Sequence, residues 1–401
     1  MTDVKDIDIF ISGGGVAGLA ATIAFAQAGF SVLCADPSPP ITTREDTGAD
    51  LRTTAFLQPA QAFLDKIGLW SAFAPHATPL QVMRIVDAGG DLAAPRATHD
   101  FNAADISDRP FGWNLPNWLL RREMVAHLKT LPNATFLPGT GTAHVLPREA
   151  EARVTLSDGT RLRAKLIVAA DGRASPVREA MGIDVKTTRY GQRALAFAVT
   201  HHAPHDNIST EVHRTGGPFT LVPLPDHEGK PCSAIVWMDR GPEIARLTAL
   251  PEAEFEAEMT ARSAGLYGPL TLASRRTVWP IISQIAERMV GERVALVAEA
   301  AHVVPPIGAQ GLNMSLADIA TLLEIVSKHP EDPGAATGLT QYSRARHTEI
   351  KARVTGVDAL NRASMADAQG LRDMRLRALN SLYSVAPVRR ILMRAGLGAT
   401  G

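Results

Sequence analysis

Cysteine and aromatic residues are scarce in this chain of 401 residues. It holds only Cys34 and Cys232, and Phe, Trp and Tyr together account for 5% of the residues. Two cysteines so far apart provide neither a disulfide framework nor the paired spacing of a zinc site, so a reducing compartment is expected. The hydrophobic content of 45% is sufficient for a large core, which excludes a disordered chain.

An excess of positive or negative charge is missing as well, and so are long apolar runs. Lys and Arg number 41 and Asp and Glu number 41, a balance that argues against a dedicated nucleic-acid-binding protein. No apolar run reaches the roughly 18 residues of a transmembrane helix. The first residues are mixed in charge and do not have the form of a signal peptide. We therefore expect a cytoplasmic protein without a nucleic-acid partner.

The N-terminal segment predicts a strand, a tight turn, a helix and a second strand. The runs 7–11 and 31–35 are short and apolar, and 19–28 is rich in alanine, a good helix former. This order is typical of a βαβ unit. Further along, alternation over 194–240 predicts a separate, mostly antiparallel sheet, and the chain from 334 onward is expected to be helical.

The turn after the first strand matches a dinucleotide-binding motif. Gly13, Gly15 and Gly18 have the spacing G-x-G-x-x-G, which permits the tight turn, the approach of a pyrophosphate and close packing of the helix. The free N–H groups at the start of that helix favour phosphate. Asp36 ends the second strand, where a carboxylate can hold a ribose hydroxyl. The alternative is a glycine-rich turn without a ligand, which the position of Asp36 disfavours.

Two later segments resemble further parts of a known flavoprotein family. Residues 166–178 read as a strand, a turn at Asp171-Gly172 and a helix, and 293–313 read as a strand, Glu299, a Pro/Gly loop and a helix. With the glycine motif they resemble the three signatures of the class A flavoprotein monooxygenases, which include para-hydroxybenzoate hydroxylase and the ubiquinone-biosynthesis hydroxylases. Looser similarity to the ubiquinone hydroxylases is found in 50–70, 217–224, 236–237 and 385–398.

The resemblance implies an α/β fold with a Rossmann-like FAD-binding domain, an inserted β-sheet substrate domain and a helical C-terminal region. The expected boundaries give a discontinuous FAD-binding domain at 1–75, 100–187 and 280–360, a substrate domain at 76–99 and 188–279, and a C-terminal helical segment at 361–401.

The resemblance also implies roles for individual residues. Gly13, Gly15 and Gly18 would hold the FAD pyrophosphate, Asp36 the adenosine ribose and Glu299 the ribityl chain. The other cofactor-binding positions that it implies are Arg52, Arg121, Asp171, Gly172, Arg178, Pro306, Gly308, Gly311, Leu312 and Asn313.

The second flavin loop departs from the family pattern at three positions. Relatives carry Gly-Asp where this chain has Ala298-Glu299, and many carry Gly where it has Ala309. We still expect FAD to bind. No acid–base triad is expected, because the flavin carries the chemistry. Pro306 and His302 are the candidates beside the ring, and a packed, purely structural histidine is the favoured alternative for His302.

The implied activity is hydroxylation of an aromatic ring of a polyprenylated phenol in ubiquinone biosynthesis. NAD(P)H would reduce FAD, and O2 would then add to the reduced flavin to form a C4a-hydroperoxide. Other proteins of that pathway would be partners. The alternatives are a hydroxylase of a small soluble phenol, a non-catalytic FAD-binding subunit, and a flavin reductase or dehydrogenase. No metal is expected, because Pro204 disturbs the spacing of His201, His202 and His205, which we interpret as solvated loop histidines.

The C-terminal tail is rich in arginine. From residue 371 onward it holds six arginines and a single acid, Asp373, with apolar residues between them at helical spacing. Such a helix either packs its apolar face on the protein with arginines in water, or lies on an anionic membrane. We expect the first arrangement, with a peripheral contact to the inner face of the membrane as the alternative.

Overall fold

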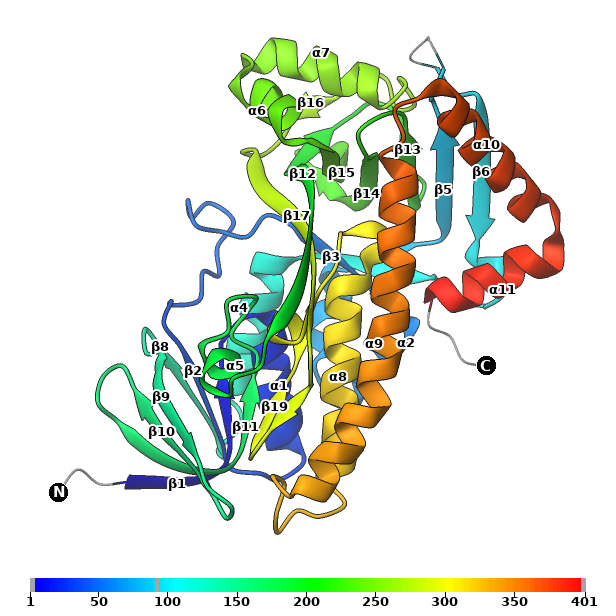
Figure 1. Ribbon diagram of the computed structural model, residues 1–401. Helices are drawn as coiled ribbons and strands as arrows, with labels where there is room; N and C mark the ends of the chain where they lie inside the picture. The colour runs from blue at the N-terminus through cyan, green and yellow to red at the C-terminus, as the bar shows by residue number, and fades with distance from the viewer. Residues whose placement is uncertain (1–3, 91–93, 398–401) are drawn as a thin grey trace.

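The structure is a computed structural model that describes residues 4–90 and 94–397 (Figure 1). The strands of these residues form three sheets, and helices cover the two larger ones. The predicted α/β class is confirmed, with both parallel and antiparallel pairing.

The first sheet is mainly parallel and forms the core of the lower half in Figure 1. β11, β1, β2 and β8 run parallel, with β1 between β11 and β2. Its strands are β1 (Val4–Ser12), β2 (Val32–Asp36), β8 (Ala134–Pro138), β9 (Thr142–Pro147), β10 (Ala152–Leu156), β11 (Arg161–Ala169), β18 (Val290–Gly291) and β19 (Val294–Leu296). Parallel strands are buried on both faces, which explains their continuous apolar runs. The carboxyl ends of the parallel strands meet at one edge, where ligands of such sheets bind.

Helix α1 (Val16–Gln27) connects β1 to β2 and is buried from Ala17 to Ala26. Its alanines allow close packing between the sheet and the neighbouring helices α4 (Asn117–Leu128) and α8 (Gln310–Val326). The predicted βαβ unit is therefore present, and its helix begins directly after the glycine motif.

The second sheet is mostly antiparallel and lies in the upper half of Figure 1. Its strands are β5 (Val82–Asp87), β6 (Ala97–Asn102), β12 (Val185–Thr200), β13 (Ile208–His213), β14 (Pro218–His227), β15 (Lys230–Arg240), β16 (Thr271–Leu272), β17 (Thr277–Ala286) and β20 (His302–Val303). α6 (Gly241–Ala249) and α7 (Glu252–Arg262) cover one face, where Phe255 packs against Phe197 and Trp237. The predicted separate antiparallel sheet over 194–240 is confirmed.

The third sheet is small and lies between the two larger ones (Figure 1). It contains β3 (Thr53–Leu57), β4 (Thr78–Leu80) and β7 (Gly112–Pro116). β7 reaches the second sheet through Asn114, whose amide donates to the carbonyl of Pro223 at 2.9 Å.

The remaining helices include the long α9, which runs from the first sheet to the second (Figure 1). They are α2 (Gln58–Lys66), α3 (Trp70–Phe73), α5 (Pro176–Ala180), α9 (Ala336–Ser364), α10 (Gln369–Ser384) and α11 (Ala386–Leu397), with the 3-10 turns η1 (Ala74–His76), η2 (Ala103–Asp105), η3 (Ala298–Ala300) and η4 (Ile307–Ala309). The expected helical chain from 334 onward is confirmed.

Three expected domain boundaries fall inside strands. β6 crosses the boundary between 99 and 100, β12 the one between 187 and 188, and β17 the one between 279 and 280. All three strands pair within the second sheet.

Two expectations about side-chain environment are wrong. Arg375 and Arg389 on α10 and α11 lie against acids of the protein, and large apolar side chains are exposed, so the arrangement differs from the one expected for the tail. His201 is buried rather than solvated, because its ring nitrogens bond to Ser233 Oγ at 2.9 Å and to the carbonyl of Ala203 at 2.7 Å.

Candidate cofactor site

The glycine motif lies at the carboxyl edge of the first sheet. Gly13 has φ +101°, and a Cβ there would lie 2.5 Å from the carbonyl oxygen of Ala170. A Cβ on Gly18 would overlap the carbonyl oxygen of Gly13. In contrast, a Cβ on Gly15 would meet nothing within 4 Å, although Gly15 caps the N-terminus of α1. Gly13 and Gly18 are thus required by the fold, whereas Gly15 leaves open space before a helix N-terminus, where a phosphate fits.

Asp36 lies beside this loop at the end of β2. Its carboxylate accepts the backbone N–H groups of Gly14 at 2.5 Å and Ser38 at 2.8 Å. Gly14 is held so close that a Cβ there would lie 2.9 Å from the Cβ of Asp36. The predicted acid therefore sits against the glycine loop, as a ribose ligand requires.

Arg52 links the third sheet to the second. Its guanidinium pairs with both carboxylate oxygens of Asp50, at 2.7 and 2.8 Å, and stacks over the Trp279 ring at 3.8 Å. Burial would lower the pKa of Arg52, but the hydrogen bonds and charge of Asp50 and the charge of Glu299 raise it overall. Glu299 itself is exposed and lies in η3.

Two predicted residues carry buried polar atoms that lack a partner among the described residues. Asp171 uses Oδ2 to accept from Ser12 Oγ at 3.1 Å and from the N–H of Val177 at 3.2 Å, but its Oδ1 has no partner. Burial raises the pKa of Asp171. The Nε of Arg121 is likewise buried without a partner. Because buried polar groups are normally hydrogen-bonded, these atoms fit a polar ligand such as FAD.

Arg178 and Asn313 form clamps on the backbone. Arg178 donates to the carbonyls of Ala300 and Arg173, both at 2.9 Å, and so ties the Asp-Gly turn to η3. The amide of Asn313 accepts from the N–H of Leu57 at 2.9 Å and donates to the carbonyl of Ala55 at 2.8 Å. These two side chains hold the loops of the candidate site in place.

The second flavin loop contains left-handed backbone at three positions. Gly308 has φ +64°, whereas Ala298 at +55° and Ala309 at +54° adopt the same region with a side chain. η4 follows Pro306, and α8 begins at Gln310. A Cβ on Gly311 would meet nothing within 4 Å, so the first turn of α8 is open.

The other two predicted positions flank these loops. Gly172, in the Asp-Gly turn, has φ +85°, and a Cβ there would meet no neighbour. Leu312 is half-buried and packs against the core of the first sheet.

A buried ionic network supports this loop from below. Asp318 on α8 accepts from the N–H of Ala298 at 3.1 Å, from His302 Nε2 at 2.6 Å and from Arg346 Nε at 2.9 Å. His302 is only 2% exposed, which places it in the packing below the loop. Burial would raise the pKa of Asp318, but the charges and hydrogen bonds of His302 and Arg346 lower it. The sequence analysis did not predict this network. Asp318, an acid between apolar residues of α8, was the feature that indicated a buried ionic partner.

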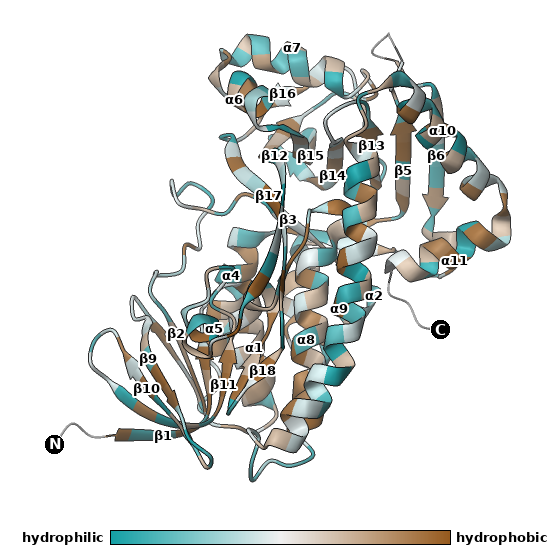
Figure 2. Ribbon diagram, in the orientation of Figure 1, coloured by the Kyte–Doolittle hydropathy of each residue, from teal (hydrophilic) through white to brown (hydrophobic). Residues whose placement is uncertain are grey.

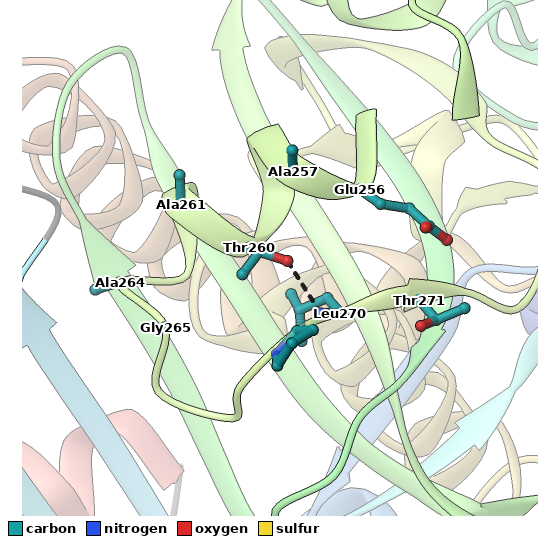
Figure 3. Close-up of a pocket in the computed structure, with 9 residues that line it drawn as sticks. Glu256, Ala257, Thr260, Ala261, Ala264, Gly265, Leu270 and Thr271 are labelled. Atoms are coloured by element: carbon teal, nitrogen blue, oxygen red, sulfur yellow. Dashed lines mark hydrogen bonds between the residues drawn. The ribbon is translucent and has the colours of Figure 1, made fainter. Parts of the chain in front are cut away.

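Among the described residues, no group of three or more His, Cys, Asp or Glu side chains could hold a metal ion. A shallow depression beside α7 is lined by small residues such as Ala257 and Gly265 (Figure 3). Its one charged side chain, Glu256, accepts the N–H of Leu272 at 2.8 Å. This depression presents no converging polar groups.

The loops, their open helix N-termini and the unpartnered buried atoms together form the candidate flavin-binding site. Residues 6–357 match the model of a family described as FAD binding domain. The chain therefore belongs to this family, FAD is its cofactor, and its class is that of the FAD-dependent monooxygenases.

Particular relatives span almost the whole chain. Ubiquinone hydroxylase UbiL of Rhodospirillum rubrum is 34% identical over 399 residues, covering 98% of this chain and 90% of the relative. The 3-demethoxyubiquinol 3-hydroxylase of Escherichia coli is 25% identical, covering 98% of both chains.

A solved structure shows the same fold. The p-nitrophenol 4-monooxygenase PnpA of Pseudomonas putida superposes with a TM-score of 0.80, covers 99% of this chain and all of that one, and is 19% identical.

Proposed function

We propose that the protein hydroxylates an aromatic ring of a polyprenylated phenol in ubiquinone biosynthesis, with O2 and NAD(P)H as co-substrates. The observation that carries the proposal is the end-to-end similarity to UbiL, named a ubiquinone hydroxylase. The sequence holds one dinucleotide fingerprint, which FAD uses, so NAD(P)H would bind without a domain of its own.

Bound FAD would supply the oxygen chemistry, and the chain would hold and shield it. The opening at Gly15 would receive the pyrophosphate, and Asp36 would bind the ribose. Arg52 and Glu299 would contact the flavin end of the cofactor. Asp171 Oδ1 would accept a hydrogen bond from the cofactor, and Arg121 Nε would donate one. These assignments rest on the unpartnered atoms and the open space at Gly15.

The N-terminus of α8 would stabilise negative charge on the flavin. Its first turn is open at Gly311, and free N–H groups there carry partial positive charge. Pro306 would lie at the ring with Gly308 and Leu312, while Asn313 and Arg178 would keep the loops in place.

An apolar surface of the second sheet supports an apolar substrate. Along β12, Leu195 and Phe197 pack toward α6 and α7, so Ala196 and Ala198 point to the opposite face. Val222 and Val236 lie on that face and are only half-buried, unlike their neighbours. We propose that this face meets the aromatic ring.

The proposed domain division follows from this arrangement. The first sheet, the third sheet and α8–α9 would form the FAD-binding domain, and the second sheet would form the substrate domain. Residues 100–102, 185–187 and 280–286 move to the substrate domain, which keeps β6, β12 and β17 whole.

We also propose a peripheral contact with the membrane, because a polyprenyl chain partitions into lipid. In 4–90 and 94–397, no helix is long and apolar enough to span a bilayer.

The test combines a gene deletion with mass spectrometry of lipid extracts. The deletion strain should accumulate a prenylated intermediate one oxygen short, and the wild-type chain should restore the product. Purified protein should oxidise NAD(P)H faster when that intermediate is added in detergent. Yellow protein without substrate-stimulated oxidation would contradict the proposal and favour a non-catalytic subunit, whereas turnover of a small phenol alone would favour a soluble substrate.

A further inference from the structure

Helix α10 turns its polar side toward the protein. Arg375 Nη2 lies 3.2 Å from Asp87 on β5, and Asp373 accepts from Arg96 Nη1 at 2.6 Å. Asp87 is almost completely buried, so these ion pairs fix which side of the helix faces inward.

The end of α10 and the start of α11 continue this pattern. The hydroxyl of Tyr383 donates to the carbonyl of Asp100 on β6 at 3.1 Å. Arg389 stacks over the Tyr383 ring at 4.9 Å and lies 3.6 Å from Asp105. Polar contacts therefore anchor α10 across β5 and β6, and Arg389 anchors α11 to η2. Figure 1 shows α10 beside these two strands.

The opposite side of both helices is apolar and exposed. Met374 is 61% exposed and Ile391 is 64% exposed. Positions 371, 374, 378, 382 and 385 follow helical spacing and all are exposed, so they form one outward stripe on and just after α10. Figure 2 shows the hydrophobic turns of α10 and α11 at this edge of the molecule. The exposed large apolar residues here are Leu371, Met374, Leu382, Val385, Ile391 and Leu392.

This concentration is specific to the C-terminal helices. Across all described residues, the other exposed large hydrophobic side chains are Val4, Leu146, Val278 and Leu360. Scattered single residues are normal on a protein surface, whereas a contiguous apolar patch marks an interaction site. Both C-terminal helices thus expose large apolar side chains, although Leu376 and Met393 are half-buried.

Positive charge borders the apolar stripe. Arg377, Arg390 and Arg394 are exposed, and in the described part of the chain none of them pairs with an acid. The single acid of this segment, Asp373, is held by Arg96 on the inner side. A surface with exposed apolar residues and arginines but no free carboxylate complements an anionic bilayer.

We propose that this surface, which we call the C-terminal face (Leu371, Met374, Leu382, Val385, Ile391 and Leu392 with Arg377, Arg390 and Arg394), docks on an anionic lipid bilayer. The apolar side chains enter the boundary between headgroups and acyl chains, and the arginines contact lipid phosphates. Charge complementarity favours this occupant over a second copy of the chain, because two copies would bring the unpaired arginines together.

The C-terminal face also lies next to the flavin loop. Gln310, the first residue of α8, donates through Nε2 to the carbonyl of Gly396 on α11 at 3.3 Å. A docked protein would thus hold this loop close to the membrane surface. Docking itself does not depend on the proposed substrate; only the delivery of a polyprenyl chain rests on that function.

Vesicle flotation of the full-length protein tests the docking. Wild type should float with vesicles of phosphatidylcholine and phosphatidylglycerol, and much less with phosphatidylcholine alone or at high salt. The double variant Met374→Gln/Ile391→Gln and the triple variant Arg377→Gln/Arg390→Gln/Arg394→Gln should each lower the bound fraction at least tenfold. The matched control Leu146→Gln/Arg161→Gln, on exposed positions of the first sheet, should bind like wild type.

The readouts separate docking from folding and from activity. FAD content and melting temperature should be the same in all variants. Turnover of substrate supplied in detergent micelles should also be the same in the variants as in wild type. A wild type that floats with vesicles but is inactive would contradict the proposed substrate and leave the docking proposal intact. The proposal would be overturned if wild type stayed in the vesicle-free bottom fraction, or if the variants floated as well as the control. So would a dimer in light scattering that the same variants dissociate without any vesicle binding.

Discussion

The two loops that we assign to FAD solve the same backbone problem in different ways. The first loop places glycine at Gly13 and Gly18, where a side chain would collide with neighbouring backbone. The second loop holds Ala298 and Ala309 in the left-handed region, where an L-residue costs about 1–2 kcal/mol. Its strain is offset by contacts from outside the loop, above all those of Asp318. One loop is thus shaped by its own composition and the other by its supports.

Replacing the support of the second loop should have the largest effect. Asp318→Ala would leave Arg346 and His302 buried without their carboxylate, and we expect a loss of about 3–5 kcal/mol in the free energy of unfolding. Urea denaturation at pH 7 measures it. Glu324→Ala, on the exposed side of the same helix, is the control and should change stability by no more than about 0.5 kcal/mol.

The same variant carries a pH signature. Because the pKa of Asp318 is lowered from 3.8 in the folded state, its contribution is present above pH 3.8 and is lost as the pH falls through the lowered pKa. The stability difference between wild type and Asp318→Ala should therefore shrink in acid. A difference independent of pH would show that shape, and not charge, is what Asp318 supplies.

Adding a methyl group to the first loop should be the next largest effect. In Gly18→Ala the Cβ would overlap the carbonyl oxygen of Gly13, and backbone cannot move aside cheaply. We expect a loss of about 3 kcal/mol in apoprotein stability, at the upper end for overpacked sites. Thermal unfolding without added FAD gives the value, and wild-type stability of this variant would show that the loop is not shaped by its glycines.

Gly15→Ala separates the needs of the ligand from those of the fold. A Cβ at Gly15 meets no protein atom within 4 Å, so apoprotein stability should change by less than about 1 kcal/mol, as for a helix N-cap. The methyl group would occupy the space assigned to the pyrophosphate, so the Kd for FAD should rise at least tenfold. Calorimetric titration of apoprotein measures this, with Gly18→Ala as the matched comparison. An unchanged Kd would remove Gly15 from the phosphate site.

The local parts of the site could be predicted from the sequence. The glycine motif, the strand before it and Asp36 lie within one βαβ unit, so spacing alone brings them together. The network of Asp318 and Arg346 could not be predicted, because its members come from two helices that meet only in the folded core. The orientation of α10 and α11 was predicted wrongly, since an amphipathic pattern does not state which side faces the protein.

The strain in the second loop should reverse the usual effect of glycine on stability. Ala298→Gly removes the side chain from a left-handed position, so it should stabilise the protein by about 1 kcal/mol even though glycine usually weakens a chain. Ala300→Gly, two residues on and not left-handed, is the control and should destabilise by about 1 kcal/mol. Paired urea titrations of the two variants give both values. If both variants lose stability, the contacts around Ala298 have relieved its backbone strain fully. The two loops would then differ in their residues but not in the strain energy that they store.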